Sequence, residues 1–304
     1  MRSTRLPLAA AIAILFGLFH VRAAAQEPID QAMIAKIKAE GMGRSEVATL
    51  FHTLADVLGP RLSGSPAYVA AARWAQDRFK EWGLANPRQE AFEFGRGWSL
   101  EKLTVEMIAP RYMPHLDSWH TATGATDNAD GVASAMEAMR LLTALGARPR
   151  RTIRVALWGG EEQGLLGARA YVKQHLASDA ARSTIAVYLN DDPGTGRTYG
   201  FYMQKNEAAK RIFDAWLEPL RDLGVKRNVI EDIGSTDHVP FDEVGLPAFT
   251  VIKDFRNYDV RTRHTNADFA DVVKVDDLKQ SAVVLAVVAW HAAMRDEPIP
   301  RRRP

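Results

Sequence analysis

Apolar segments of strand length alternate with helical segments along the second half of this 304-residue chain. The pattern predicts helices over residues 131–145, 165–175, 207–223 and 275–294, and extended segments over residues 152–158, 184–189, 199–203 and 247–252. Such alternation, with near-continuous apolar strands, is typical of an α/β fold in which helices cover both faces of a largely parallel sheet. We therefore expect an α/β domain of this kind.

The first half of the chain is expected to be mainly helical. Apolar residues recur at spacings of three and four over residues 29–40 and 45–58. A third helix is expected over residues 66–82, because Gly83 is a usual residue after a helix end, and extended segments follow at 89–94 and 103–109. The apolar part of the closing helix is too short to span a membrane, so we expect a buried core helix.

Residues 1–25 have the composition of a secretory signal peptide. Two arginines precede an apolar run at residues 6–19, and three alanines at 23–25 supply a cleavage site. The run is shorter than the roughly 20 residues of a membrane span, and no cysteine follows it to carry a lipid. We therefore expect a mature chain that begins at Gln26, has no stable membrane anchor, and is secreted or periplasmic.

The mature chain has balanced charges and no cysteine. Removing residues 1–25 takes away three arginines and no acids, so lysine plus arginine falls from 39 to 36 against 37 acidic residues, and the net charge moves from +2 to −1. This balance gives no sign of a nucleic-acid partner. Without disulfides, stability must come from an apolar core, and residues 26–304 are long enough to form one domain.

Five short motifs carry imidazoles and carboxylates beside turn-forming residues. Imidazole nitrogen and carboxylate oxygen bind divalent metals such as zinc, and catalytic zinc sites keep one position open for water. Together the motifs predict a two-metal hydrolase. Their candidate residues are His115 and Asp117, Asp127, Glu161 and Glu162, Asp192, and His264.

Two of these motifs follow expected strands. Glu161 and Glu162 come after residues 152–158 and a Gly-Gly turn, and ligand sites of open α/β sheets lie at the carboxyl ends of strands. Adjacent acids are often a solvated surface pair, but the buried type of the preceding strand favours a functional pair. Asp192 stands at an equivalent place after residues 184–189, where Asp191 is a competing candidate.

The other motifs lie in loop-like sequence. Asp127 stands just before the helix expected from Gly131, where an aspartate commonly caps the helix. Asp130 is better placed as that cap, which leaves Asp127 available to a metal. Asp117 lies two residues from His115, so its carboxylate can orient the imidazole through the second ring nitrogen.

These motifs in combination resemble the M28 family of zinc metallopeptidases, in particular its secreted carboxypeptidase Q-like bacterial members. The resemblance extends over residues 59–295 and rests on HLDSW, GATDNADG, LWGGEEQGLLGARAYV, TDHVPF and RHTNAD. It implies a three-layer sandwich with a mostly parallel mixed sheet flanked by helices. It also implies two zinc ions per chain and the hydrolysis of short peptides or dipeptides near a free terminus.

The resemblance implies a ligand set for the two zinc ions. Asp127 would bridge them. His115 and Asp192 would complete one site, and Glu162 and His264 would complete the other.

The resemblance assigns roles to further residues. Asp117 would orient His115, and Glu161 would be the general base that takes a proton from the attacking water. Asp237 and His238 match a family motif near the substrate pocket, without an assigned step.

Two features depart from the family pattern. Larger secreted members carry an inserted protease-associated domain before the His-x-Asp motif, and a hydrophobic strand normally runs straight into that histidine. Here two prolines lie between residues 103–109 and His115, which an ordinary central strand does not tolerate. We expect a deletion junction near 110–115 that removed the insert with one or two strands; alternatively, residues 103–109 replace the missing strand. Arg263 also stands where relatives often have histidine.

Two alternatives to a secreted exopeptidase remain. The abnormal junction is compatible with a non-catalytic relative that acts as a binding protein. The second alternative is a single-zinc acyltransferase of the glutaminyl cyclase type, although the intact His115, Asp117 and Asp192 argue against this alternative. The sequence leaves open the side-chain preference, the oligomeric state, and the choice among aminopeptidase, carboxypeptidase and dipeptidase action.

Overall fold

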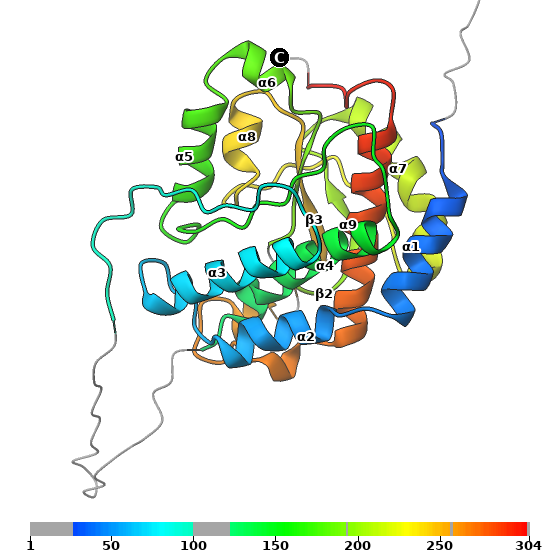
Figure 1. Cartoon of the computed structure of the whole chain (residues 1–304). Coiled ribbons are helices and arrows are strands. Elements are labelled where there is room, and N and C mark those ends of the chain that lie inside the picture. The colour runs from blue at the N-terminus through cyan, green and yellow to red at the C-terminus, as the bar shows by residue number, and fades with distance from the viewer. Residues whose placement is uncertain (1–26, 100–121, 193, 256–257, 303–304) are drawn as a thin grey trace, which may run out of the picture.

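A computed structural model of the chain describes residues 27–99, 122–192, 194–255 and 258–302 (Figure 1). Helices make up most of the regular structure in these ranges. They are α1 (Gln31–Gly43), α2 (Val47–His52), α3 (Pro66–Glu81), α4 (Asp130–Ala144), α5 (Leu166–His175), α6 (Asp179–Ser183), α7 (Glu207–Leu217), α8 (Val239–Glu243) and α9 (Val275–Met294). Short π- or 3₁₀-type turns are η1 (Thr53–Val57), η2 (Ala125–Ala129), η3 (Glu218–Leu223), η4 (Tyr258–Thr262) and η5 (Ala270–Val272).

Several helices begin where a polar side chain caps them. The side chain of Asp30 accepts a hydrogen bond from the Met33 N–H at the start of α1, and Ser65 does the same for Tyr68 at the start of α3. Such caps satisfy backbone donors that have no partner within the helix. At its other end α3 stops before Gly83, whose φ of 75° is one that glycine adopts readily.

The sheet described has three strands in the order β1 (Tyr188–Asn190), β3 (Ala248–Asp254), β2 (Thr195–Tyr202). β1 pairs with β3 in parallel, whereas β2 pairs with β3 in antiparallel. The expected mixed sheet is therefore present, with one parallel and one antiparallel pair among the described strands. Two strands so close in sequence, β1 and β2, run in opposite directions because a short connection reverses the chain between them.

Helices cover both faces of this sheet. Successive side chains of a strand point to opposite faces, and β3 illustrates this with two adjacent residues. Phe249 belongs to a core formed with α1, α4, α7 and α9, whereas Ala248 belongs to a core formed with α5 and α8. Figure 1 shows α7 and α9 on one side of β3 and α5 and α8 on the other.

A further core lies beside the sheet, between α2, α3 and the start of α4. Leu54, Phe79 and Met136 are among its buried residues. Ala125 and Ala129 of η2 are also buried in it, so this core anchors the turn that contains Asp127.

The helices predicted from sequence are confirmed. α9 matches the range expected for the closing helix, and 14 of its 20 residues are buried, as expected for a core helix. No helix in the part of the chain that the structure describes is long and apolar enough to span a bilayer.

Two expected extended segments are not found as strands among the described residues. Residues 152–158 and 89–94 form no strand with any other described residues. Residues 152–158 are alternately exposed and half-buried, and the backbone N–H of Arg151 donates to Ala293 of α9 rather than to a strand. The strand expected at 184–189 is found later, as β1.

Several expectations fall outside the described residues. They concern the leader at 1–25, the mature start at Gln26, and the segment 103–109 with the junction near 110–115.

Candidate metal centre

Asp127 lies in η2 and is held there by residues from the C-terminal part of the chain. The carboxylate of Asp268 accepts hydrogen bonds from the backbone N–H of Thr126 at 2.8 Å and of Asp127 at 3.1 Å. The hydroxyl of Tyr258 donates to the Asp127 carboxylate at 2.9 Å. The Arg61 guanidinium stabilises the same turn by donating hydrogen bonds to the carbonyls of Thr123 and Gly124.

Asp127, Glu162 and His264 converge from three distant segments. Nε2 of His264 lies 3.1 Å from a carboxylate oxygen of Glu162 and 3.4 Å from one of Asp127. One ligand atom from each residue lies within 4.8 Å of the other two. Two carboxylates and an imidazole at this spacing are donors of the kind that bind zinc.

Glu161 and Glu162 emerge from a tightly packed glycine turn. A Cβ at Gly159 would lie 2.1 Å from the Tyr68 hydroxyl, and Gly160 has a φ of 70°. Glycine is therefore required at both positions for the loop to take this path. Burial and the nearby carboxylates, Asp192 first among them, raise the pKa of Glu161 to about 9. Burial, followed by the charge of Asp127, raises the pKa of Glu162.

Asp192 faces the same region from the end of β1. It accepts a short hydrogen bond from the Thr236 hydroxyl. Burial raises its pKa to about 7, and the charges of Asp127 and Glu162 add to that effect. Asp191, the competing candidate, is instead engaged with Lys253 at 2.6 Å.

A cleft of about 470 Å³ joins these groups. A second hollow of about 290 Å³ shares Asp127, Glu162 and His264 with it. The cleft brings together five candidate residues from separate motifs, and its walls also contain two arginines and two aromatic side chains. The five candidates are Asp127, Glu161, Glu162, Asp192 and His264, and the other four residues are Arg169, Arg263, Phe255 and Tyr258.

Residues 111–289 match the sequence model of peptidase family M28, over more than half of the 304-residue chain. The chain belongs to peptidase family M28. The resemblance inferred from the motifs is therefore confirmed.

Individual M28 relatives agree with this assignment. Carboxypeptidase Q of Mus musculus is 33% identical over 187 residues, which are 62% of this chain and 39% of that protein. The crystal structure of a peptidase M28 precursor from Shewanella amazonensis SB2B is 30% identical with a TM-score of 0.55, over 62% of this chain and 42% of its own. The chain thus spans about two fifths of the length of the curated relative.

A more distant structure extends the fold comparison. A zinc aminopeptidase from Bacillus subtilis has a TM-score of 0.58 over 83% of this chain and 98% of its own, at 17% identity. At that identity the likeness concerns the α/β fold, which is the fold of M28 aminopeptidase-like structures.

The described residues of this M28 chain fit a divalent metal. Their ligand atoms lie close enough to share one ion. Burial raises the pKa values of Glu161, Glu162 and Asp192, and the charge of Asp127 raises all three further. A cation between them would offset this repulsion. His115 and Asp117, the remaining predicted members, lie outside the described residues and stay predictions.

The M28 motif TDHVPF lies beside the cleft, as expected, but its residues differ in position. Thr236 lines the cleft. His238 is fully buried, and its Nε2 donates to the Ile233 carbonyl at 3.0 Å. Asp237 is also buried, and its pKa is raised to about 7 by burial and by Asp192.

Tyr258, Asp268 and Lys253 were not expected to contribute to the site. Asp268 ends the RHTNAD motif, so its position in that motif was an available signal. The local sequence around Tyr258 and Lys253 contains no turn or charge pattern that indicates a role in the site.

Proposed function

We propose that this chain is a secreted or periplasmic zinc-dependent exopeptidase that hydrolyses short peptides or dipeptides, with Glu161 as general base. The observation that carries the proposal is the convergence of Asp127, Glu162 and His264 in a cleft that also contains Glu161 and Asp192. Family membership supports peptide hydrolysis, and the similar proteins include a carboxypeptidase and an aminopeptidase.

The metal ligands we propose are those inferred from the M28 motifs. Asp127, Glu162, Asp192 and His264 would hold zinc together with His115, and the expected number is two ions per chain. Zinc in such a site supplies Lewis acidity, which lowers the pKa of water and polarises a carbonyl. Asp117 would orient His115 through its second ring nitrogen.

Glu161 is suited to move the proton. Its carboxylate lies in the cleft beside the ligand Glu162 but is absent from the close trio of ligand atoms. It would accept a proton from the attacking water and deliver it to the leaving amine of the peptide. Burial and the nearby carboxylates raise the pKa of Glu161 to about 9, so a cation in the cleft would bring its pKa down toward the working pH.

Metal content separates this proposal from its alternatives. Purified mature protein, loaded with zinc and desalted, is analysed for metal per chain. About two zinc ions support the exopeptidase, one supports cyclase-like chemistry or an incomplete site, and none supports a binding protein. Turnover of dipeptides against their N-blocked and C-amidated forms then assigns amino- or carboxy-terminal action.

Substitution of Glu161 tests the general base. Glu161→Gln is expected to retain zinc and to lower kcat by about 10²- to 10⁴-fold, because general-base catalysis is lost while the ligands stay. Glu162→Gln is the matched control, and it is expected to lose zinc as well as activity. Unchanged kcat in Glu161→Gln would refute the role of Glu161.

Export is tested by the mature N-terminus. The protein expressed with its leader in a bacterial host is expected in the periplasm or medium, with Gln26 as its first residue. An uncleaved cytosolic product would contradict a secreted enzyme.

A further inference from the structure

Lys253 is a buried cation that does not line the cleft. It lies in β3, and its residue is 2% exposed. Its Nζ lies 2.6 Å from a carboxylate oxygen of Asp191 and 3.3 Å from one of Asp130. Both partner carboxylates are almost completely buried as well.

The two aspartates belong to the two segments that carry cleft carboxylates. Asp130 begins α4, three residues after Asp127, and Asp191 immediately precedes Asp192. Lys253 therefore contacts neighbours of both presumed ligands without contacting the ligands themselves.

The same two segments also touch directly. The side-chain amide of Asn128 donates to the Asp191 carbonyl at 2.9 Å. A Cβ at Gly131 would lie only 2.3 Å from that carbonyl oxygen. The segments are therefore closely packed, and Lys253 supplies the positive charge that allows two buried carboxylates to lie on either side of the contact.

We propose that Lys253 is a positioning residue that fixes the spacing between the Asp127 and Asp192 segments and thereby sets the affinity of the cleft for zinc. This inference rests on the proposed function, because it assumes that those two aspartates bind the metal. Removal of the Lys253 charge would leave two buried carboxyl groups without the cation that both of them contact, so the packing between the two segments would rearrange. Residues that orient metal ligands commonly change metal affinity by about 10- to 100-fold when they are replaced.

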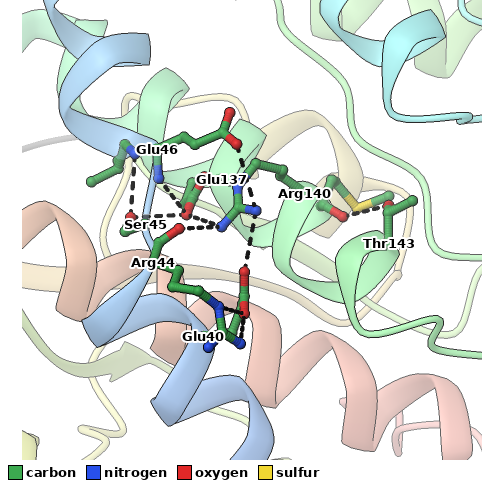
Figure 2. Close-up of polar contacts among 9 residues, drawn as sticks. Glu40, Arg44, Ser45, Glu46, Glu137, Arg140 and Thr143 are labelled. Atoms are coloured by element: carbon green, nitrogen blue, oxygen red, sulfur yellow. Dashed lines mark hydrogen bonds and ion pairs between the residues drawn. The ribbon is translucent and has the colours of Figure 1, made fainter.

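A second buried ion network on α4 provides a matched control. Arg140 lies 2.7 Å from the Glu137 carboxylate, and it also donates to the Arg44 carbonyl (Figure 2). The side chains of Arg140 and Glu137 are 7% and 0% exposed. The network joins α4 to the link between α1 and α2, where Ser45 donates to Glu137, and Arg140 and Glu137 do not line the cleft.

The experiment measures the zinc dissociation constant by competition with a chromophoric chelator. The proteins are the wild-type mature chain, Lys253→Met, Lys253→Arg and Arg140→Met. Circular dichroism and thermal unfolding of the metal-free forms establish that each is folded at the assay temperature. We expect Lys253→Met to weaken zinc binding at least tenfold, Lys253→Arg to recover part of it, and Arg140→Met to stay within twofold of wild type.

Each outcome decides the proposal. Wild-type zinc affinity in folded Lys253→Met overturns it, and so does an equal loss of affinity in Arg140→Met. If Lys253→Met does not fold, Asp130→Asn is measured in its place, because this variant keeps the Lys253–Asp191 pair. A several-fold loss of zinc affinity in Asp130→Asn supports the proposal, and an unchanged zinc affinity refutes it. Failure of the wild-type protein to bind zinc at all would instead refute the proposed function, and this inference with it.

Discussion

Asp127 is oriented by two residues that lie more than 130 positions later in the chain. The Asp268 carboxylate accepts hydrogen bonds from the backbone N–H groups of Asp127 and Thr126, and the Tyr258 hydroxyl donates to the Asp127 carboxylate. Hydrogen bonds of this kind fix the position of a ligand before the metal arrives. The aspartate that the motifs assign as the bridge is thus held through both its backbone and its side chain.

Gly131 is a residue whose replacement should separate the ligand segments. A Cβ there would lie 2.3 Å from both the Asn128 side chain and the Asp191 carbonyl. Gly131→Ala is therefore expected to lower the free energy of unfolding by about 1–3 kcal/mol, as overpacking does, and to weaken zinc binding. Chemical denaturation of the metal-free protein and zinc titration measure the two effects.

Gly43 provides the control for this substitution. It ends α1, and a Cβ there would have no atom within 4 Å. Gly43→Ala is expected to leave zinc binding unchanged and to be neutral or slightly stabilising, because alanine has the higher helix propensity. Equal behaviour of the two alanine variants would show that the contact at Gly131 is not tight.

At the scale of elements, the turn before α8 depends on a neutral histidine. His238 is fully buried, its Nε2 donates to Ile233, and burial lowers its pKa from 6.5 to about 4. Below pH 6.5 the unfolded chain binds a proton that the folded protein does not, so this contribution to stability is lost as the pH falls from 6.5 toward 4.

This lowered pKa of His238 predicts an acid-sensitive stability. Between pH 7.5 and pH 5.5 the wild-type protein is expected to lose about 1 kcal/mol of unfolding free energy through His238. His238→Gln should lose correspondingly less over the same interval, even if it is less stable at pH 7.5. Denaturant unfolding of the metal-free proteins at both pH values measures the difference, and identical pH dependence in both would contradict it.

Helices with a strong apolar pattern could be predicted from the sequence, whereas the pairing of strands could not. α9 has the expected range because its apolar character is continuous over 20 residues. Residues 152–158 have the composition of a buried strand, yet they pair with no other described strand. Composition alone does not specify pairing, because a strand requires a partner that the tertiary fold supplies.

The same limit applies to the candidate site. Asp127, Glu161, Glu162, Asp192 and His264 were identified from motifs, and they line one cleft. Tyr258 and Lys253 were not identified, because their roles come from contacts with segments far away in sequence. Local sequence marks the candidate ligands, whereas the residues that hold them in place are determined by the tertiary fold.

On the scale of the whole molecule, the cleft connects cores that are otherwise separate. Asp127 is anchored through η2 in the core of α2 and α3. Glu162 precedes α5, which belongs to the core with α8 on one face of the sheet. A metal bound by Asp127, Glu162 and His264 would therefore cross-link these parts of the fold, in addition to any role in catalysis.

Metal removal should consequently lower global stability. A ligand that binds only the folded state stabilises it by about 4 kcal/mol when present at 1,000 times its dissociation constant. For a chain of this size we expect a chelator to lower the thermal midpoint of the zinc-loaded protein by roughly 10 °C. His264→Ala, which lacks one of the three converging ligands, should show a much smaller difference between its zinc-treated and chelated forms. A wild-type midpoint that is the same with and without chelator would mean that zinc does not hold these segments together.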